Sequence, residues 1–168
     1  LLLDLPPGTG DMAISVAQLI PGSEIIVVTT PQQAASEVAE RAGSISVQTH
    51  QRLVGVIENM SWMELPDGSR AEVFGSGGGQ AVADSLSLLI GTTVPLLGQI
   101  PLDPALRVGA DEGHPVAVAA PDSPSGAALR AIARQLAQRS RGLAGKKLGL
   151  SPTGAGAKPS ASFGLTPS

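Results

Sequence analysis

The strongest indication of a fold class in the sequence is Leu1-Leu2-Leu3-Asp4-Leu5-Pro6-Pro7-Gly8-Thr9-Gly10-Asp11. The leucine run does not alternate with polar residues, which is typical of a parallel strand buried on both faces. Asp4 would then lie near the carboxyl end of this strand, where open α/β sheets bind ligands. Pro6 and Pro7 cannot continue a strand ladder, and Gly8 lets main-chain N–H groups approach an anion. The stretch therefore predicts an α/β protein with a ligand site at this strand end.

The same stretch favours a nucleotide site on chemical grounds. An acid at a strand end can order Mg²⁺, usually through water, and a glycine loop after it can contact a γ-phosphate. An acid followed by a Gly/Pro turn would by itself fit a capped turn without a ligand. The whole string from Asp4 to Asp11 favours the magnesium side of a nucleoside triphosphatase.

Composition limits the classes of protein that fit. The chain has 168 residues, with 11 Lys and Arg against 14 Asp and Glu and a net charge of −3, which gives no electrostatic case for a nucleic-acid or membrane partner. It contains no cysteine, so disulfides and thiolate metal sites within it are excluded. No apolar stretch is long enough to span a bilayer, and we expect a cytoplasmic location. Because Leu1 falls inside an expected core strand, the chain is interpreted as the carboxy-terminal part of a longer protein.

Strands and helices are expected to alternate along residues 1–141. Apolar runs predict strands, and apolar residues at helical spacing predict helices between them. The predicted strands after the first are 24–29, 53–58, 95–100 and a short edge strand at 114–119. The first helix is expected to bury Met12, Val16, Leu19 and Ile20. This alternation predicts a mainly parallel sheet with helices on both faces.

Two segments depart from that alternation. Residues 62–74 are polar and carry Pro66-Asp67-Gly68, which predicts a hairpin excursion from the sheet. Residues 142–168 are rich in Gly, Ser, Pro and Ala without periodicity. This composition predicts a disordered tail after the globular part.

Five strings occur in order along the chain: Leu-Leu-Asp-Leu-Pro-Pro-Gly-Thr-Gly-Asp, Val-Thr-Thr-Pro-Gln, Gly-Val-Ile-Glu-Asn-Met-Ser, Phe-Gly-Ser-Gly-Gly-Gly and Leu-Gly-Gln-Ile-Pro-Leu-Asp. Together they resemble the Mrp/ApbC-type iron–sulfur cluster carrier proteins, a branch of the deviant P-loop ATPases that includes MinD and ParA-type proteins. The resemblance runs from Leu1 to about Leu136. It implies a Rossmann-like P-loop fold, binding and slow hydrolysis of ATP with Mg²⁺, a homodimer, and transfer of a [4Fe–4S] cluster to apo iron–sulfur target proteins.

The resemblance also implies roles at the phosphates. By matching positions, Asp4 corresponds to the Walker B acid that holds Mg²⁺ through water. Gly8 corresponds to the switch glycine that faces the γ-phosphate. Asp11 would be a second acid that binds or relays.

Other matching positions imply a site for the base. Asn59 lies where the family's Asn touches adenine, and an amide can both donate to and accept from a purine edge. The loop that closes the other side of the base corresponds to Pro101, Leu102 and Asp103. Asp103 stands before a proline, so it also fits a helix cap, and the two roles are compatible.

Two departures from the family pattern bear on function. The Walker A pattern Gly-x-x-x-x-Gly-Lys-Ser/Thr does not occur in the sequence, so we expect it upstream of Leu1 and expect this chain alone not to hydrolyse ATP. Many family members carry Cys-Pro-x-Cys after the Asn-Met-Ser string, but here Leu65-Pro66-Asp67-Gly68 corresponds to it. Leu65 and Gly68 cannot ligate iron.

The leading hypothesis is therefore an ATPase of the iron–sulfur carrier family without these cluster ligands. One alternative is a MinD- or ParA-like positioning ATPase on the same fold. Another is a non-enzymatic interaction domain with a decayed nucleotide site.

Overall fold

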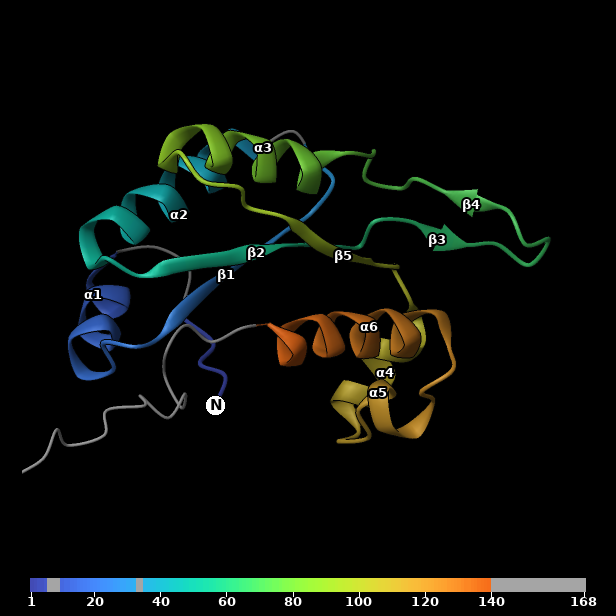
Figure 1. Ribbon diagram of the computed structural model, residues 1–168. Coiled ribbons are helices and arrows are strands. Elements are labelled where there is room, and N and C mark those ends of the chain that lie inside the picture. Colours follow the sequence, from blue (N-terminus) through green and yellow to red (C-terminus); the bar gives the residue numbers. More distant parts are fainter. Residues whose placement is uncertain (6–9, 33–34, 140–168) are drawn as a thin grey trace, which may run out of the picture.

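The computed structural model describes residues 1–5, 10–32 and 35–139 (Figure 1). Its main sheet has three parallel strands in the order β1-β2-β5. The strands are β1 (Glu24–Thr29), β2 (Arg52–Asn59) and β5 (Leu96–Ile100). All three are rich in Val, Ile and Leu, as expected for strands covered on both faces. The predicted strands in these positions, and the mainly parallel α/β fold, are confirmed.

Helices cover both faces of this sheet (Figure 1). On one face lie α2 (Ala35–Thr49) and α3 (Gly78–Ile90), and α1 (Gly10–Leu19) contacts α2. On the other face α6 (Pro124–Gln138) packs on β5. The core on the α3 side is Val27, Ala39, Leu53, Val56, Val82, Ala83, Leu86 and Val94. The core on the α6 side is Val54, Leu97, Ile100 and Ile132. Among the described helices, none has the length and apolar character needed to cross a membrane.

A pair of glycines lets α3 begin against the sheet. A Cβ on Gly78 would lie 2.6 Å from the main-chain oxygens of Thr30 and Pro31. A Cβ on Gly79 would lie 2.6 Å from the Cβ of Glu58. Because real Cβ atoms do not approach so closely, only glycine allows this contact, which brings the amino end of α3 to the carboxyl edge of the sheet.

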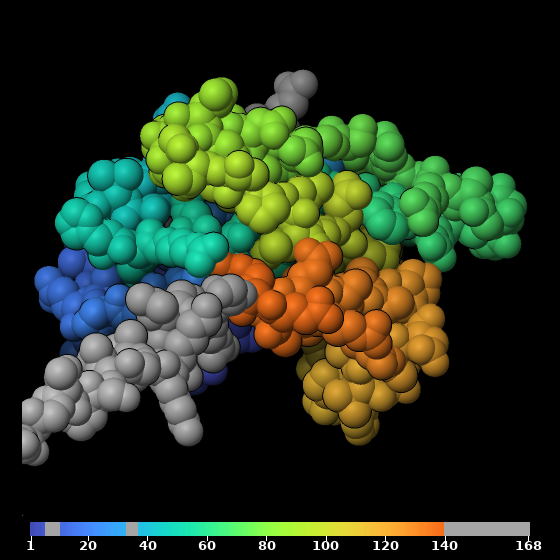
Figure 2. Space-filling model, in the orientation of Figure 1, coloured from blue at the N-terminus to red at the C-terminus, as the bar shows by residue number. Residues whose placement is uncertain are grey.

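The segment after β2 leaves the body of the molecule as a hairpin. It consists of β3 (Met63–Glu64) and β4 (Arg70–Ala71), which pair antiparallel. Figures 1 and 2 show it projecting beyond the carboxyl edge of the sheet. The predicted excursion over residues 62–74 is confirmed.

The opening leucine run does not form the predicted strand. Residues 1–5 have no regular secondary structure, and all five are exposed. A strand exists only where a neighbour supplies hydrogen bonds, and within the described residues β1 pairs only with β2. Asp4 therefore does not lie at a strand end here.

Two smaller predictions are also wrong. The buried face of α1 is not the predicted one. Ala13 is buried, whereas Met12 and Leu19, which were expected in the core, are exposed. Residues 114–119 contain no edge strand; a short helix, α5 (Val116–Ala119), lies there instead, after α4 (Pro104–Asp111), and contacts α6. Apolar spacing over so few residues fits either conformation, and packing against α6 decides between them. The predicted tail, 142–168, lies outside the described residues.

Candidate functional site

The carboxyl ends of β2 and β5 lie side by side, because the two strands are parallel neighbours. Asn59, the last residue of β2, pairs with Ile100, the last residue of β5. The segment Pro101–Asp103 follows directly and leads into α4. The structure thus brings together Asn59 and the 101–103 loop, which sequence analysis assigned to one base site from positions some forty residues apart.

Asn59 points toward the face of the sheet that carries α4 and α6. Side chains alternate along a strand, and Ile57 packs into the core on that face. The Oδ1 atom of Asn59 accepts a hydrogen bond from the main-chain N–H of Met60 at 3.0 Å. Met60 has a positive φ of 59°, which turns the chain sharply at the strand end. The bond to Met60 leaves the Nδ2 donors of Asn59 available to a ligand.

Hydrogen bonds at Leu102 and Asp103 hold the 101–103 loop in place. The main-chain N–H of Leu102 donates to the carbonyl oxygen of Trp62 at 2.7 Å. Asp103 caps α4, since its Oδ1 accepts from the N–H of Ala105 at 2.8 Å, and this confirms the predicted cap. The Oδ2 atom of Asp103 accepts a second bond from the hydroxyl of Ser125.

Glu58 is a site residue that sequence analysis missed. Its side chain is 1% exposed and faces α3, opposite to Asn59. Its Oε2 accepts from the N–H of Gly79 at 2.6 Å, and its Oε1 accepts from Nε2 of Gln99 at 2.7 Å. Within the described residues no ion pair involves it. The available signal was a single carboxylate at the end of the apolar run 53–57.

The Glu58 carboxyl is held in its charged form. Burial by itself raises the pKa of this group, but the hydrogen bonds from Gly79 and Gln99, aided by the nearby Ser61 hydroxyl, outweigh burial and leave the pKa below its ordinary value. A buried carboxylate that keeps its charge ties three elements together: β2, β5 and the amino end of α3.

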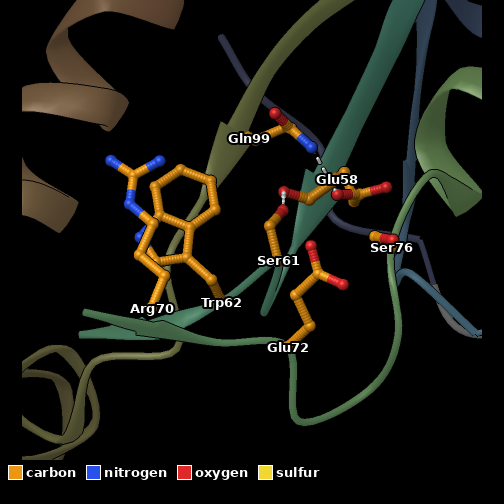
Figure 3. Close-up of a pocket in the computed structure, with 7 residues that line it drawn as sticks. All are labelled: Glu58, Ser61, Trp62, Arg70, Glu72, Ser76 and Gln99. Atoms are coloured by element: carbon orange, nitrogen blue, oxygen red, sulfur yellow. Dashed lines mark hydrogen bonds between the residues drawn. The ribbon is translucent and has the colours of Figure 1, made fainter. Parts of the chain in front are cut away.

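A polar cavity of about 460 Å³ opens at the root of the hairpin (Figure 3). It is lined by Glu58, Ser61, Trp62, Arg70, Glu72, Ser76 and Gln99. The guanidinium of Arg70 lies over the Trp62 ring, 4.2 Å from its centroid, so this charge is already engaged in a cation–π contact. The cavity lies on the Glu58 side of the strand, away from Asn59.

Of the residues predicted at the phosphates, the structure describes Asp4 and Asp11. Asp4 is exposed in the irregular segment 1–5, and Asp11 is exposed in the first turn of α1. Gly8 lies outside the described residues. Their predicted roles remain predictions.

Comparison with known proteins decides the family. The ParA family model, described as NUBPL iron-transfer P-loop NTPase, matches residues 1–137. The chain belongs to this family. The iron–sulfur cluster carrier protein of Mycobacterium leprae is 66% identical over 153 residues, which cover 91% of this chain and 40% of the relative. That of Synechocystis is 41% identical over 140 residues, covering 82% of this chain and 38% of the relative. The chain thus spans about 40% of the length of these curated relatives.

A solved structure agrees with this assignment. It is a nucleotide-binding protein from Archaeoglobus fulgidus in complex with ADP, 30% identical, with a TM-score of 0.52 over 73% of this chain and 47% of that one. The P-loop NTPase fold and the iron–sulfur carrier family predicted from the sequence are confirmed.

The turn at the tip of the hairpin is where the resemblance implied the family's cysteine pair. Leu65 accepts from the N–H of Gly68 and donates its own N–H to Ser69, both at 2.9 Å. Asp67 accepts from the N–H of Ser69 at 2.9 Å, and Gly68 has a φ of 82°. The turn is thus closed by its own hydrogen bonds. In the described part of the chain, no group of three or more His, Cys, Asp or Glu side chains could hold a metal ion, so these residues do not fit an iron–sulfur cluster.

Proposed function

We propose that this chain is the carboxy-terminal portion of an ATP-dependent iron–sulfur carrier and supplies the adenine side of its nucleotide site. One observation carries the proposal: Asn59 and the 101–103 loop meet on adjacent ends of parallel strands. The carboxyl edge of a parallel sheet is where open α/β folds bind nucleotides. The family match and the names of the relatives favour an iron–sulfur carrier over a positioning ATPase.

Each residue of the base site has a distinct task in this proposal. Asn59 presents its Nδ2 donors to the purine edge while Met60 holds its Oδ1. Pro101 and Leu102 flank the base with apolar surface. Asp103 fixes the loop by capping α4. None of these groups needs to ionise or react, so the task of this edge is recognition of the base and not chemistry.

The phosphate side of the proposal rests on the family. Asp4 would hold Mg²⁺ through water, Gly8 would face the γ-phosphate, and Asp11 would be a second acid. Magnesium would supply charge neutralisation at the phosphates. Hydrolysis would also need the Walker A lysine, which this chain does not contain.

The cluster is cargo in this proposal, and this chain supplies no ligand for it. The intact protein would act as an ATP-switched homodimer in the maturation of apo iron–sulfur proteins. Iron measured on the full-length protein after anaerobic reconstitution tests direct carriage. Absence of bound iron in a protein that binds ATP would show that the ATP-switched dimer acts without carrying the cluster itself.

The base site is tested by Asn59→Asp in the full-length protein. This variant keeps the acceptor for Met60 but removes the Nδ2 donors and places a negative charge at the base edge. We expect ATP to bind about tenfold more weakly, equivalent to about 1.4 kcal/mol, in isothermal titration calorimetry. Gln48→Glu makes the same amide-to-carboxylate change on an exposed part of α2 and should leave ATP affinity unchanged. Equal ATP affinity of Asn59→Asp and the wild type would refute the assignment.

A further inference from the structure

Ser125 is a fully buried hydroxyl in the first turn of α6. Its exposure is 0%, and its Oγ donates to Oδ2 of Asp103 across 22 positions of sequence. The helix start is fixed around it. Ser123 caps the helix by accepting from the N–H of Gly126 at 3.2 Å. A Cβ on Gly126 would lie 2.3 Å from the carbonyl oxygen of Ala120, so the first turn of α6 sits tightly against the preceding turn.

The bond from Ser125 is additional to what the helix cap requires. Capping of α4 uses only Oδ1 of Asp103, which accepts from Ala105. The second oxygen, Oδ2, is therefore free to bind another element, and it accepts the hydrogen bond from Ser125 of α6. The loop is consequently anchored twice, to the hairpin root through Leu102 and Trp62 and to α6 through Asp103 and Ser125.

The α6 helix packs closely on the sheet, so a loop bound to α6 is held in a fixed position relative to the sheet. Ile132 of α6 packs against Val54 and Leu97 in the core on that face. A Cβ on Gly98 would lie 2.7 Å from Cγ1 of Ile132, so helix and sheet are in close contact. The strand β2 of this same sheet carries Asn59. The Ser125–Asp103 bond thus fixes the loop relative to the strand that bears Asn59.

From this arrangement we propose that Ser125 is a positioning residue for base recognition, which sets the spacing between the 101–103 loop and Asn59. The inference rests on the proposed function, because it assigns the base to that gap. Adenine and guanine share one ring skeleton and differ in the donors and acceptors at their edges. A loop held in a fixed position keeps the base in one register with the protein's polar groups, whereas a loose loop lets either base find an acceptable register. Ser125 therefore contributes to the preference for adenine over guanine without touching the nucleotide.

The test is Ser125→Ala in the full-length protein, with ATP and GTP affinities measured by isothermal titration calorimetry. We expect ATP affinity to fall about fivefold to tenfold. The lost bond, a buried hydrogen bond to a charged group, is the one that anchors the 101–103 loop to α6. GTP affinity should change less than twofold, so the preference for ATP falls by a similar factor. A merely structural role would lower both affinities together and leave their ratio unchanged, which would overturn the proposal.

Ser123→Ala is the matched control in the same helix. It removes the cap of α6 but does not contact Asp103, so it should lower stability and leave the ATP to GTP ratio unchanged. A fall in that ratio equal to the fall in Ser125→Ala would overturn the proposal, because helix stability alone would then explain both.

Asp103→Ser keeps the test decisive if Ser125→Ala does not fold. Serine is a good helix cap, but it lacks the second oxygen that Ser125 binds. It should lower the ATP to GTP ratio, and a ratio equal to that of the wild type would refute action through Asp103. Where Ser125→Ala folds, adding it to Asp103→Ser should lower the ratio no further, and an additive effect would also refute action through Asp103. A wild-type protein without any preference for ATP would instead refute the proposed base site, so the two failures are distinguishable.

Discussion

The buried carboxylate of Glu58 offers the sharpest test of the architecture at the sheet edge. Glu58→Gln keeps the size of the side chain and removes its charge. The amide oxygen can still accept from Gly79, and its NH₂ can donate to Gln99 once the Gln99 amide turns over. Both hydrogen bonds therefore survive in neutral form, and the variant isolates the contribution of the charge.

The magnitude follows from the two bonds. A hydrogen bond to a charged group exceeds a neutral one by about 1 kcal/mol, so two bonds give about 2 kcal/mol. The amide is less costly to bury than the carboxylate, which offsets about half of this. We expect Glu58→Gln to lower the free energy of unfolding at pH 7 by about 1 kcal/mol. Glu58→Ala, which leaves the Gly79 N–H without a partner and opens a cavity, should lower it by about 3 kcal/mol.

The pH dependence identifies the charge as the cause. The pKa of Glu58 in the folded protein is lowered, so its stabilising contribution is full above the unfolded pKa of about 4.3. The contribution declines as the pH falls through the lower, folded pKa. The difference in unfolding free energy between wild type and Glu58→Gln should be constant from about pH 5 to pH 7 and shrink below about pH 4.3.

Urea denaturation of the full-length protein, followed by circular dichroism across this pH range, measures the difference. Glu64→Gln removes a charge from an exposed position of β3 and should change the free energy of unfolding by less than about 0.5 kcal/mol. A Glu58→Gln protein as stable as wild type at pH 7, or a stability difference that does not change on acidification, would show that the charge of Glu58 does not stabilise the fold.

Three further substitutions test neighbouring contacts. Gly79→Ala should destabilise by about 2 kcal/mol in urea denaturation, because its Cβ would overlap the Cβ of Glu58; Gly22→Ala, with nothing within 4 Å of its Cβ, should stay within about 0.5 kcal/mol. Arg70→Ala should shift the fluorescence of Trp62 and cost about 0.5–1 kcal/mol, and an unchanged spectrum would contradict the stacking. Asp103→Ala should cost about 2–3 kcal/mol of stability, because it uncaps α4 and leaves the buried Ser125 hydroxyl without its acceptor; equal stability would show both hydrogen bonds to be dispensable.

Local patterns predicted much of the fold because their causes are local. The run Ile25–Val28 consists of β-branched apolar residues, which favour a strand, although only Val27 of the four is buried and Val28 is exposed. Asp103 before Pro104 begins a helix through a hydrogen bond two residues away. Pro66-Asp67-Gly68 closes a turn because Gly68 takes a positive φ.

Other predictions failed because the deciding contacts are distant in sequence. The leucines of residues 1–3 are as apolar as those of β5, but a strand also needs a partner, and the described strands provide none for them. The apolar residues of α1 fit a helix, but contact with α2 determines which of its faces is buried. The prediction that Asn59 and the 101–103 loop belong to one base site came from the family resemblance. Their spacing in the sequence does not by itself show that the two segments lie close together.

Residue types and patterns within a few turns of chain were enough to predict the family, the parallel α/β class and the main strands. Three features depend instead on tertiary packing: Glu58 is buried and charged, Gly79 admits its hydrogen bond, and Ser125 reaches Asp103. Each of these contacts joins residues twenty or more positions apart. The strength of each contact depends on the distance and orientation of its two partners. The packing of the helices on the sheet determines both.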